Sequence, residues 1–232
     1  MADLNFPSNP NVGDTFTIGT RTWVWNGYGW QIQSAITSLD PFTAVRGIFT
    51  TSTVAVSTST GGLQVRGGVG IGGNIVVGRS AITRNITNAN MYSSGSFAAD
   101  GDAQVGFYIL RRQVAAAIPT ALTTDGGVAG TGNQVIMPND SAYAFKILVT
   151  AKATTSNNEG AWEFNGIISK ASGTGSTAIK VVNKTKIWSS NAAYDVNVIA
   201  DIVYGGLQVV ANAADSNPVR FVAKVETVEI TA

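Results

Sequence analysis

Alternation of apolar and polar residues is clearest between residues 141 and 232. The stretch AYAFKILVTAKA puts Tyr143, Phe145, Ile147 and Val149 on one side of an extended chain, because successive side chains of a strand point to opposite faces. The stretches GAWEFNGIIS, AIKVVNKTKIWS, YDVNVIADIVYGG, LQVVANAA and PVRFVAKVETVEI continue the pattern. Residues 141–232 therefore predict a C-terminal head of six short strands, folded as an antiparallel β-sandwich or jelly roll.

Residues 1–33 carry a second, smaller strand pattern. TFTIGTRTWVWNGYGWQIQ predicts three strands separated by two turns, and the Asn-Gly pair in the second turn is a strong hairpin signal. Trp23 and Trp25 share one face of a strand, and Trp30 follows in the next strand. Two interpretations are open: the three tryptophans form the core of a mini-domain, or some of them dock onto a partner and attach the chain to it.

Residues 34–84 are rich in Gly, Ser and Thr and poor in charge. In GGLQVRGGVGIGGNIVVG the apolar residues recur mostly with period two, at Leu63, Val65, Val69, Ile71, Ile75 and Val77. One chain cannot build a globular core from small side chains on a glycine-rich backbone. Three copies around an axis bury these side chains against one another. The segment therefore predicts an intertwined β shaft within a homotrimer, with those six residues as the shaft core.

The same stretch contains a G-x-G-x-x-G spacing at Gly68, Gly70 and Gly73. A dinucleotide-binding loop opens a helix and is followed by an acidic residue about 20 positions later. Here NIVVGRSAIT favours a strand, and no Asp or Glu occurs between Asp40 and Asp100. The calcium-binding G-G-x-G-x-D repeat also fails, because glycine stands in place of its aspartate. We therefore expect no cofactor.

Residues 85–140 are expected to form a β region that connects the shaft to the head. QVGFYILRRQVAAA is compatible with a short helix and with a strand. Glycine-rich turns are expected at 125–127 and 130–133. The predicted organisation of this all-β chain is thus an attachment module (1–33), a shaft (34–84), a connecting region (85–140) and a head (141–232).

Composition removes several classes of function. The net charge is +1 and only 12% of residues are charged, so no long-range field favours nucleic acid or an anionic membrane. The chain has no Cys and no His, which removes disulfides, thiol nucleophiles, the usual zinc sites and His-based acid–base catalysis. No signal-peptide pattern and no run of about 18 apolar residues occur, so we expect a protein made in a cytoplasm, without membrane insertion.

Few acidic residues are available for chemistry. The D-x-D pattern of Asp100, Gly101 and Asp102 is expected to be a turn rather than a cation site. Glu159 and Glu163 share a strand face roughly 13 Å apart, too far for the carboxylate pair of a glycosidase. We therefore expect no enzyme and no metal site. The enzymatic alternative is a polysaccharide depolymerase with carboxylates at chain interfaces.

Basic residues of the chain are scattered, with one adjacent pair, Arg111-Arg112. The pair is expected to be a solvated strand or helix edge, and its functional alternative is contact with an anionic glycan or phosphate. A second basic feature follows even-numbered positions. On a regular strand, one face would carry Lys180, Lys184, Lys186 and Trp188 together. This pattern predicts an edge strand whose lysines prevent aggregation, and the alternative is a sugar-binding strip.

A receptor contact on the head would need exposed aromatic side chains in a groove. The residues singled out for that contact are Trp188, Tyr194 and Tyr204, with host surface polysaccharide as the partner. No nucleic-acid partner is expected.

Three stretches resemble proteins of tailed bacteriophages. VAVSTSTGGLQVRGGVGIGGNIVVG resembles a segment of tail-fibre and other virion structural proteins, especially of myoviruses and cyanophages. NFPSNPNVGDTFTIGTRTWVWNGYGWQ is similar to a short Trp-rich module of such proteins, and residues 142–229 are similar to C-terminal β domains of phage fibre-like proteins. The resemblance implies a trimeric appendage of the virion, assembled in the bacterial host cytoplasm.

In that appendage the N-terminal module, with Trp23, Trp25 and Trp30, attaches to other virion proteins and the head points outward to the host surface. A capsid decoration (cement) protein and a neck or baseplate fibre without receptor binding are the alternatives.

Overall fold

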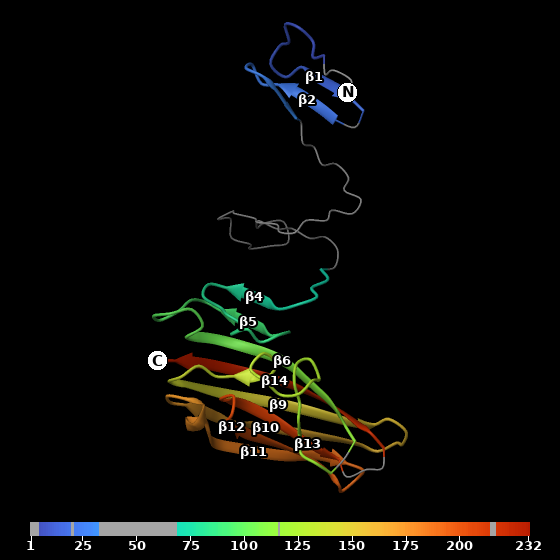
Figure 1. The fold of residues 1–232 in the computed structure, drawn as a ribbon, viewed down its shortest axis with the longest axis vertical. Coiled ribbons are helices and arrows are strands. Elements are labelled where there is room, and N and C mark those ends of the chain that lie inside the picture. The colour runs from blue at the N-terminus through green and yellow to red at the C-terminus, as the bar shows by residue number, and fades with distance from the viewer. Residues whose placement is uncertain (1–4, 20, 33–68, 116, 214–216) are drawn as a thin grey trace. The chain divides into compact units, whose positions relative to one another are not determined.

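The structure is a computed structural model that describes residues 5–19, 21–32, 69–115, 117–213 and 217–232 (Figure 1). Within these ranges the regular elements are β-strands and one short 3₁₀ turn at Thr174–Ser176, so the all-β prediction is confirmed. No helix in the described part of the chain has the length and apolar character that a membrane span requires. The chain divides into two compact units, Met1–Gly68 and Val69–Ala232.

The N-terminal unit contains a three-stranded antiparallel sheet in the order β1 (Thr15–Ile18), β2 (Arg21–Trp25) and β3 (Trp30–Ile32). In the turn between β2 and β3, the side-chain oxygen of Asn26 accepts hydrogen bonds from the backbone N–H groups of Tyr28 and Gly29, each at 2.9 Å. Gly27 has a φ of +97°, a conformation that favours glycine. The predicted Trp-rich hairpin module is confirmed.

The remaining strands form two sheets in the C-terminal unit. They are β4 (Ile75–Gly78), β5 (Asn90–Ser93), β6 (Ala103–Val114), β7 (Thr120–Ala121), β8 (Val135–Ile136), β9 (Ser141–Ala153), β10 (Glu159–Lys170), β11 (Ala178–Ser189), β12 (Tyr194–Asp201), β13 (Gly206–Ala213) and β14 (Val219–Thr231). Seven strands form one sheet in the order β11-β10-β9-β14-β6-β5-β4, and β12, β13, β7 and β8 form a four-stranded sheet. The β4–β5 pair is parallel and the other pairs are antiparallel.

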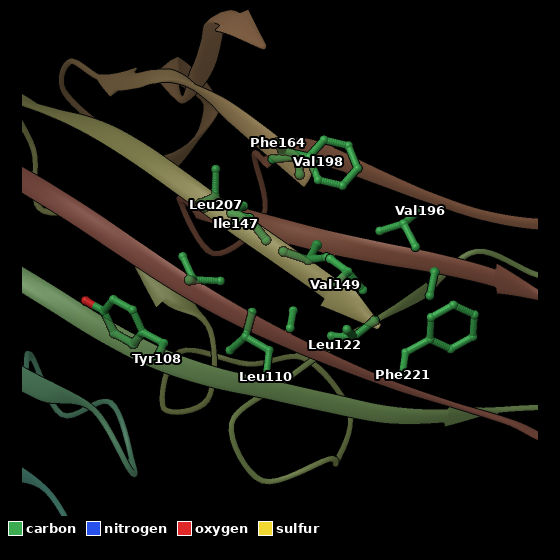
Figure 2. Close-up of a cluster of buried hydrophobic side chains, with 14 of the residues drawn as sticks. Tyr108, Leu110, Leu122, Ile147, Val149, Phe164, Val196, Val198, Leu207 and Phe221 are labelled. Atoms are coloured by element: carbon green, nitrogen blue, oxygen red, sulfur yellow. The ribbon is translucent and has the colours of Figure 1, made fainter. Parts of the chain in front are cut away.

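The core lies between the two sheets (Figure 2). The larger sheet contributes alternate residues, among them Tyr108, Leu110, Tyr143, Phe145, Ile147, Val149, Trp162, Phe164 and Phe221. The smaller sheet contributes Val196, Val198, Leu207 and Val209. Burial of each large apolar side chain stabilises the fold by about 1.5–3 kcal/mol. The six head strands predicted by alternation are β9 to β14, and the antiparallel β-sandwich is confirmed.

The stretch QVGFYILRRQVAAA, for which the sequence allows both a helix and a strand, forms most of β6. β6 lies between β14 and β5 in the seven-stranded sheet. Its even-numbered residues from Gln104 to Leu110 are buried, whereas the odd-numbered ones are half-buried or exposed. The strand forms because β14 offers it a full set of antiparallel backbone partners, from Ala103 to Val114.

Strands on both sides of the predicted boundaries at 84/85 and 140/141 pair within the seven-stranded sheet. β4 and β5 pair across the first boundary, and β6 pairs with β14 across the second. The region 85–140 thus contributes β5 and β6 to the sheet that also contains β9, β10, β11 and β14 of the head.

Part of the predicted shaft falls outside the described residues. Of its six predicted core residues, two lie there, Leu63 and Val65. Val69 and Ile71 are 63% and 54% exposed, and Ile75 and Val77 belong to β4, at the edge of the seven-stranded sheet. The intertwined shaft and the homotrimer stay predictions.

Candidate functional site

Five aromatic rings meet in the N-terminal unit. Phe6 stacks on Trp30 with ring centroids 5.3 Å apart and meets Trp23 edge-on at 5.6 Å. Phe16 lies within 6.2 Å of both of these tryptophans, and Trp25 lies 5.7 Å from Trp30. Trp23 is buried, whereas Trp25 and Trp30 are half-buried. Trp23 is therefore a core residue of the module, and an attachment role for the three tryptophans stays a prediction.

The three predicted receptor-contact residues lie in different environments. Trp188 is 59% exposed near the end of β11, and Tyr204 is 37% exposed in the turn between β12 and β13. Tyr194 is completely buried, with its ring centroid 6.4 Å from that of Phe221. The receptor-contact prediction is wrong for Tyr194, because this residue occupies the first core-facing position of β12.

Two β-bulges divide the predicted lysine strip on β11. Lys184 and Lys186 pair with core-facing residues of β10. The register then shifts between Ala161 and Trp162, so Trp188 pairs with Ala161 and lies on the opposite face of the sheet. The prediction that these lysines and Trp188 share one face of the strand is therefore wrong. β11 is an edge strand with exposed lysines, as the edge-strand interpretation predicts.

The outer face of the seven-stranded sheet, opposite the core, carries an apolar stripe that crosses all seven strands. Residues that are paired across neighbouring strands share a face, so the register identifies the members of the stripe. From β4 to β11 they are Val77, Tyr92, Val105, Val228, Ala144, Ile167 and Val181. Figure 1 shows the strands that the stripe crosses. With neighbouring strands about 4.8 Å apart, the stripe is roughly 30 Å long.

Most of the apolar stripe is open to solvent in the single chain. Val228 and Val181 are 63% and 55% exposed, and Tyr92 is 41% exposed. Ile230, the next outward position on β14, is 52% exposed. Contiguous exposed apolar strips of this kind are typical of surfaces through which proteins contact other macromolecules. Alternation along each strand shows which residues point outward but not the register between strands, so the sequence alone did not reveal the stripe.

Charged residues on the same outer face form ion pairs within the chain. Three exposed pairs lie there: Lys146–Glu163 at 3.3 Å, Lys152–Glu159 at 3.4 Å and Lys224–Glu226 at 2.7 Å. Each pair cancels its own charge, so this part of the face is close to neutral. Glu159 and Glu163 thus contact two different lysines.

Three arginines line one hollow at the end of the seven-stranded sheet away from the apolar stripe, and two of them, Arg111 and Arg220, face outward. This hollow of about 410 Å³, the arginine hollow, is lined mainly by Arg111, Arg112, Gln113, Gly126 and Arg220. Arg111 donates through Nη2 to the backbone carbonyl of Asp125 at 2.6 Å, and Arg112 donates through Nη1 to that of Gly126 at 2.6 Å. The Arg220 Nε donates to the Gln113 side-chain oxygen at 3.2 Å. The adjacent basic pair of the sequence thus lines the same hollow as a third arginine, Arg220 of β14.

The D-x-D segment forms a turn, as expected. The Asp102 carboxylate accepts hydrogen bonds from the backbone N–H groups of Phe97, Ala98 and Ala99, at 3.0, 2.6 and 2.8 Å. The bonds from Ala99 and Ala98 hold the pKa of Asp102 below its ordinary value, against the opposing effect of burial. Among the described residues, no group of three or more acidic, His or Cys side chains is placed to hold a metal ion.

No protein-family model matches the chain, and no match is found among curated proteins. Two solved structures of phage proteins are distantly similar to it. The tailspike protein gp49 of Acinetobacter baumannii bacteriophage Fri1, a capsular polysaccharide depolymerase, matches with 14% identity and a TM-score of 0.31, over 54% of this chain and 18% of that chain. The tailspike protein of Acinetobacter phage vB_ApiP_P1 matches with 15% identity and a TM-score of 0.26, over 54% of this chain and 22% of that chain. The chain thus spans about a fifth of the length of each tailspike that it matches.

Proposed function

We propose that the chain is a subunit of a homotrimeric fibre or spike on the virion of a tailed bacteriophage, and that its copies pack through the apolar stripe. The observation that carries this proposal is the stripe itself, which leaves valine, isoleucine and tyrosine side chains in water on each isolated copy. Their removal from water stabilises an assembly by about 25 cal/mol per Å² of apolar surface. The sequence resemblance of residues 54–78 and of the N-terminal module to phage fibre proteins supports the class of assembly.

The charges beside the apolar stripe favour a second copy as its partner. Lys146 pairs with Glu163, and Lys224 pairs with Glu226, within the chain. Two identical surfaces that carry an unbalanced charge repel each other, whereas identical neutral surfaces do not. The part of the outer face around the apolar stripe therefore meets another copy of itself without an electrostatic penalty.

The apolar stripe is also continuous with the predicted shaft. Val77 of β4 is the first residue of the stripe and one of the predicted shaft core residues. Upstream of it, Val69 and Ile71 are 63% and 54% exposed within this chain. Three chains that join along the shaft would bring their β4 edges together, which supports the use of one continuous apolar surface for both contacts.

The remaining parts of the molecule take their roles from this assembly. The Trp-rich module attaches the trimer to other virion proteins, and the head contacts the surface of the host cell. The protein acts through geometry and several weak contacts made at once, since three heads on one fibre raise the effective concentration of each contact. No catalytic step belongs to this proposal.

Oligomeric state and thiol protection test the proposal with the full chain. Sedimentation equilibrium is expected to give three times the chain mass of 24.1 kDa. Because the chain has no Cys, a Val228→Cys variant carries a single thiol in the apolar stripe. Ile202→Cys is the matched control, since Ile202 is 59% exposed in the turn after β12. Maleimide labelling is expected to be at least about tenfold slower at position 228, as burial in a packed interface excludes the reagent.

The two measurements separate the parts of the proposal. A folded monomer in sedimentation overturns the trimer. A trimer in which both thiols react equally fast retains the assembly but overturns the role of the apolar stripe.

A cryo-EM reconstruction of the intact virion tests the location. Three-fold bundles that project from the particle support the fibre or spike, and their attachment point separates a tail fibre from a neck or baseplate fibre. A flat array of many copies across neighbouring capsomers identifies a decoration protein and overturns the proposal.

A further inference from the structure

We propose that the arginine hollow binds the oxyanion group, a carboxylate or a sulfate, of an acidic glycan. Arg111 and Arg112 reach it from β6, and Arg220 reaches it from β14. Three arginines from two neighbouring strands therefore line one hollow of about 410 Å³. Arg111 and Arg220 occupy outward-facing strand positions, whereas Arg112 has the opposite parity and contributes from the edge of β6. This size falls within the roughly 300–1,000 Å³ of ligand pockets and suits one sugar residue of a longer chain.

The positive charge of the arginine hollow is not balanced within the described chain. None of the salt bridges that the described residues form includes Arg111, Arg112 or Arg220. Each of these arginines instead donates one hydrogen bond to a neutral oxygen. Since a guanidinium carries five N–H donors, most of the donors stay available for a ligand.

The loop after β7 supports two of the guanidinium groups while its own carboxylate points elsewhere. The Asp125 side chain accepts hydrogen bonds from the Gly127 backbone N–H at 2.8 Å, the Thr123 hydroxyl at 3.0 Å and the Asn133 amide at 3.0 Å. The bond from Gly127 makes the largest contribution to holding the pKa of Asp125 below its ordinary value. The carboxylate thus stabilises the loop, and the loop carbonyls position Arg111 and Arg112.

The next acidic residue on the neighbouring strands is also engaged. Lys152 of β9 pairs in register with Arg220, and Glu159 of β10 pairs in register with Lys152. The Glu159 carboxylate lies 3.4 Å from the Lys152 ammonium. This lysine therefore neutralises the carboxylate that lies two strands from Arg220, and the pair leaves the charge of the arginine hollow unbalanced.

Oxyanions fit this arrangement better than neutral sugars do. The planar guanidinium fork matches the two oxygens of a carboxylate or sulfate, and such charge-assisted hydrogen bonds are about twice as strong as neutral ones. The inference deepens the proposed contact with the host surface, and it rests on that proposal only for the source of the glycan. Binding of the oxyanion itself does not depend on trimer formation.

Titration calorimetry with the full chain tests the inference. The probes are polygalacturonate oligomers, free galacturonate, sodium sulfate and a neutral maltose oligomer. Arg220→Gln removes one positive charge from the hollow. Arg220→Lys keeps that charge but removes the planar guanidinium with its paired N–H donors. The matched control is Lys186→Gln, which removes one charge from exposed positions of the edge strand β11.

The expected result is binding of polygalacturonate and no binding of the maltose oligomer. We expect about tenfold weaker binding in Arg220→Gln, intermediate binding in Arg220→Lys and unchanged binding in Lys186→Gln, since loss of one charge-assisted contact costs about one decade of affinity. Free galacturonate and sulfate that compete with the polymer assign the oxyanion as the recognised group. Absence of binding to every acidic probe, or equal weakening by Lys186→Gln, overturns the inference. Either result leaves the sedimentation test of the trimer unaffected.

Discussion

Arg84 and Glu229 form a buried ion pair between residues 145 positions apart in the chain, with side chains 9% and 0% exposed. The Glu229 carboxylate also accepts hydrogen bonds from the Gln104 amide at 2.8 Å, the Tyr108 hydroxyl at 2.9 Å and the Thr227 hydroxyl at 2.7 Å. The four donors satisfy both carboxylate oxygens away from water. The network ties the segment between β4 and β5 to the last strand of the head, which holds the β4 end of the apolar stripe in place.

Replacement of Glu229 by Gln is expected to destabilise the C-terminal unit by about 3 kcal/mol, because removal of one partner leaves the Arg84 charge buried and unpaired. The measurement is the free energy of unfolding in urea, followed by tryptophan fluorescence and circular dichroism. The double variant Arg84→Met with Glu229→Gln is expected to recover part of the loss, since it removes both charges. A loss below about 1 kcal/mol in the single variant contradicts an energetic role for the pair.

Acid stability is expected to depend on Asp102. Backbone N–H groups hold the pKa of this carboxyl below its ordinary value in the folded chain, led by that of Ala99. A group with a depressed folded pKa contributes stability above its unfolded pKa of about 3.9, and that contribution is lost as the pH falls through the folded pKa. Asp102→Asn is therefore expected to be less stable than the wild type at pH 7 and to lose less stability between pH 7 and pH 3. Urea midpoints at the two pH values measure this, and an equal loss in both proteins contradicts it.

Strand alternation predicted the core of the head well, because it depends on local geometry. Tyr143, Phe145, Trp162 and Phe221 all face the core as their parity requires. The bulge between Lys186 and Trp188 broke the same argument at Trp188, since an extra residue reverses the face of every position beyond it.

Features that depend on cross-strand register could not be predicted from the sequence. The apolar stripe exists because Val228 lies beside Val105 and Ala144, and only the paired strands establish that. The arginine hollow needs Arg220 beside a basic pair more than 100 positions earlier in the chain. The Arg84–Glu229 pair is equally non-local, and no periodicity connects its two members.

Gly166 is expected to be essential for the pairing of β10 with β11. A Cβ atom at this position would lie 2.1 Å from the Val181 carbonyl oxygen and 2.7 Å from the ring of Phe145. Because the first neighbour is backbone, β11 must move, and Gly166→Ala is expected to cost about 2 kcal/mol of unfolding free energy. Gly175→Ala is the control, since no atom lies within 4 Å of its added Cβ, and its effect is expected to stay within about 0.5 kcal/mol. Equal stability of the two variants in urea contradicts the tight approach.

Alanine variants of Trp188 and Tyr194 are expected to show that Trp188 acts in surface contact whereas Tyr194 acts in core packing. Tyr194→Ala removes a fully buried ring next to Phe221, and we expect a loss of about 3 kcal/mol from the cavity that remains. Trp188→Ala removes a ring that is 59% exposed, and we expect a change in unfolding free energy below about 1 kcal/mol. If Trp188 makes the proposed contact with the host surface, its variant retains the wild-type unfolding midpoint while the fraction of the protein that binds host cells falls several-fold. Thermal unfolding and a cell-binding assay on the same preparations measure both effects. Unchanged cell binding by Trp188→Ala removes this residue from the contact surface, and a Tyr194→Ala protein as stable as the wild type contradicts the core assignment.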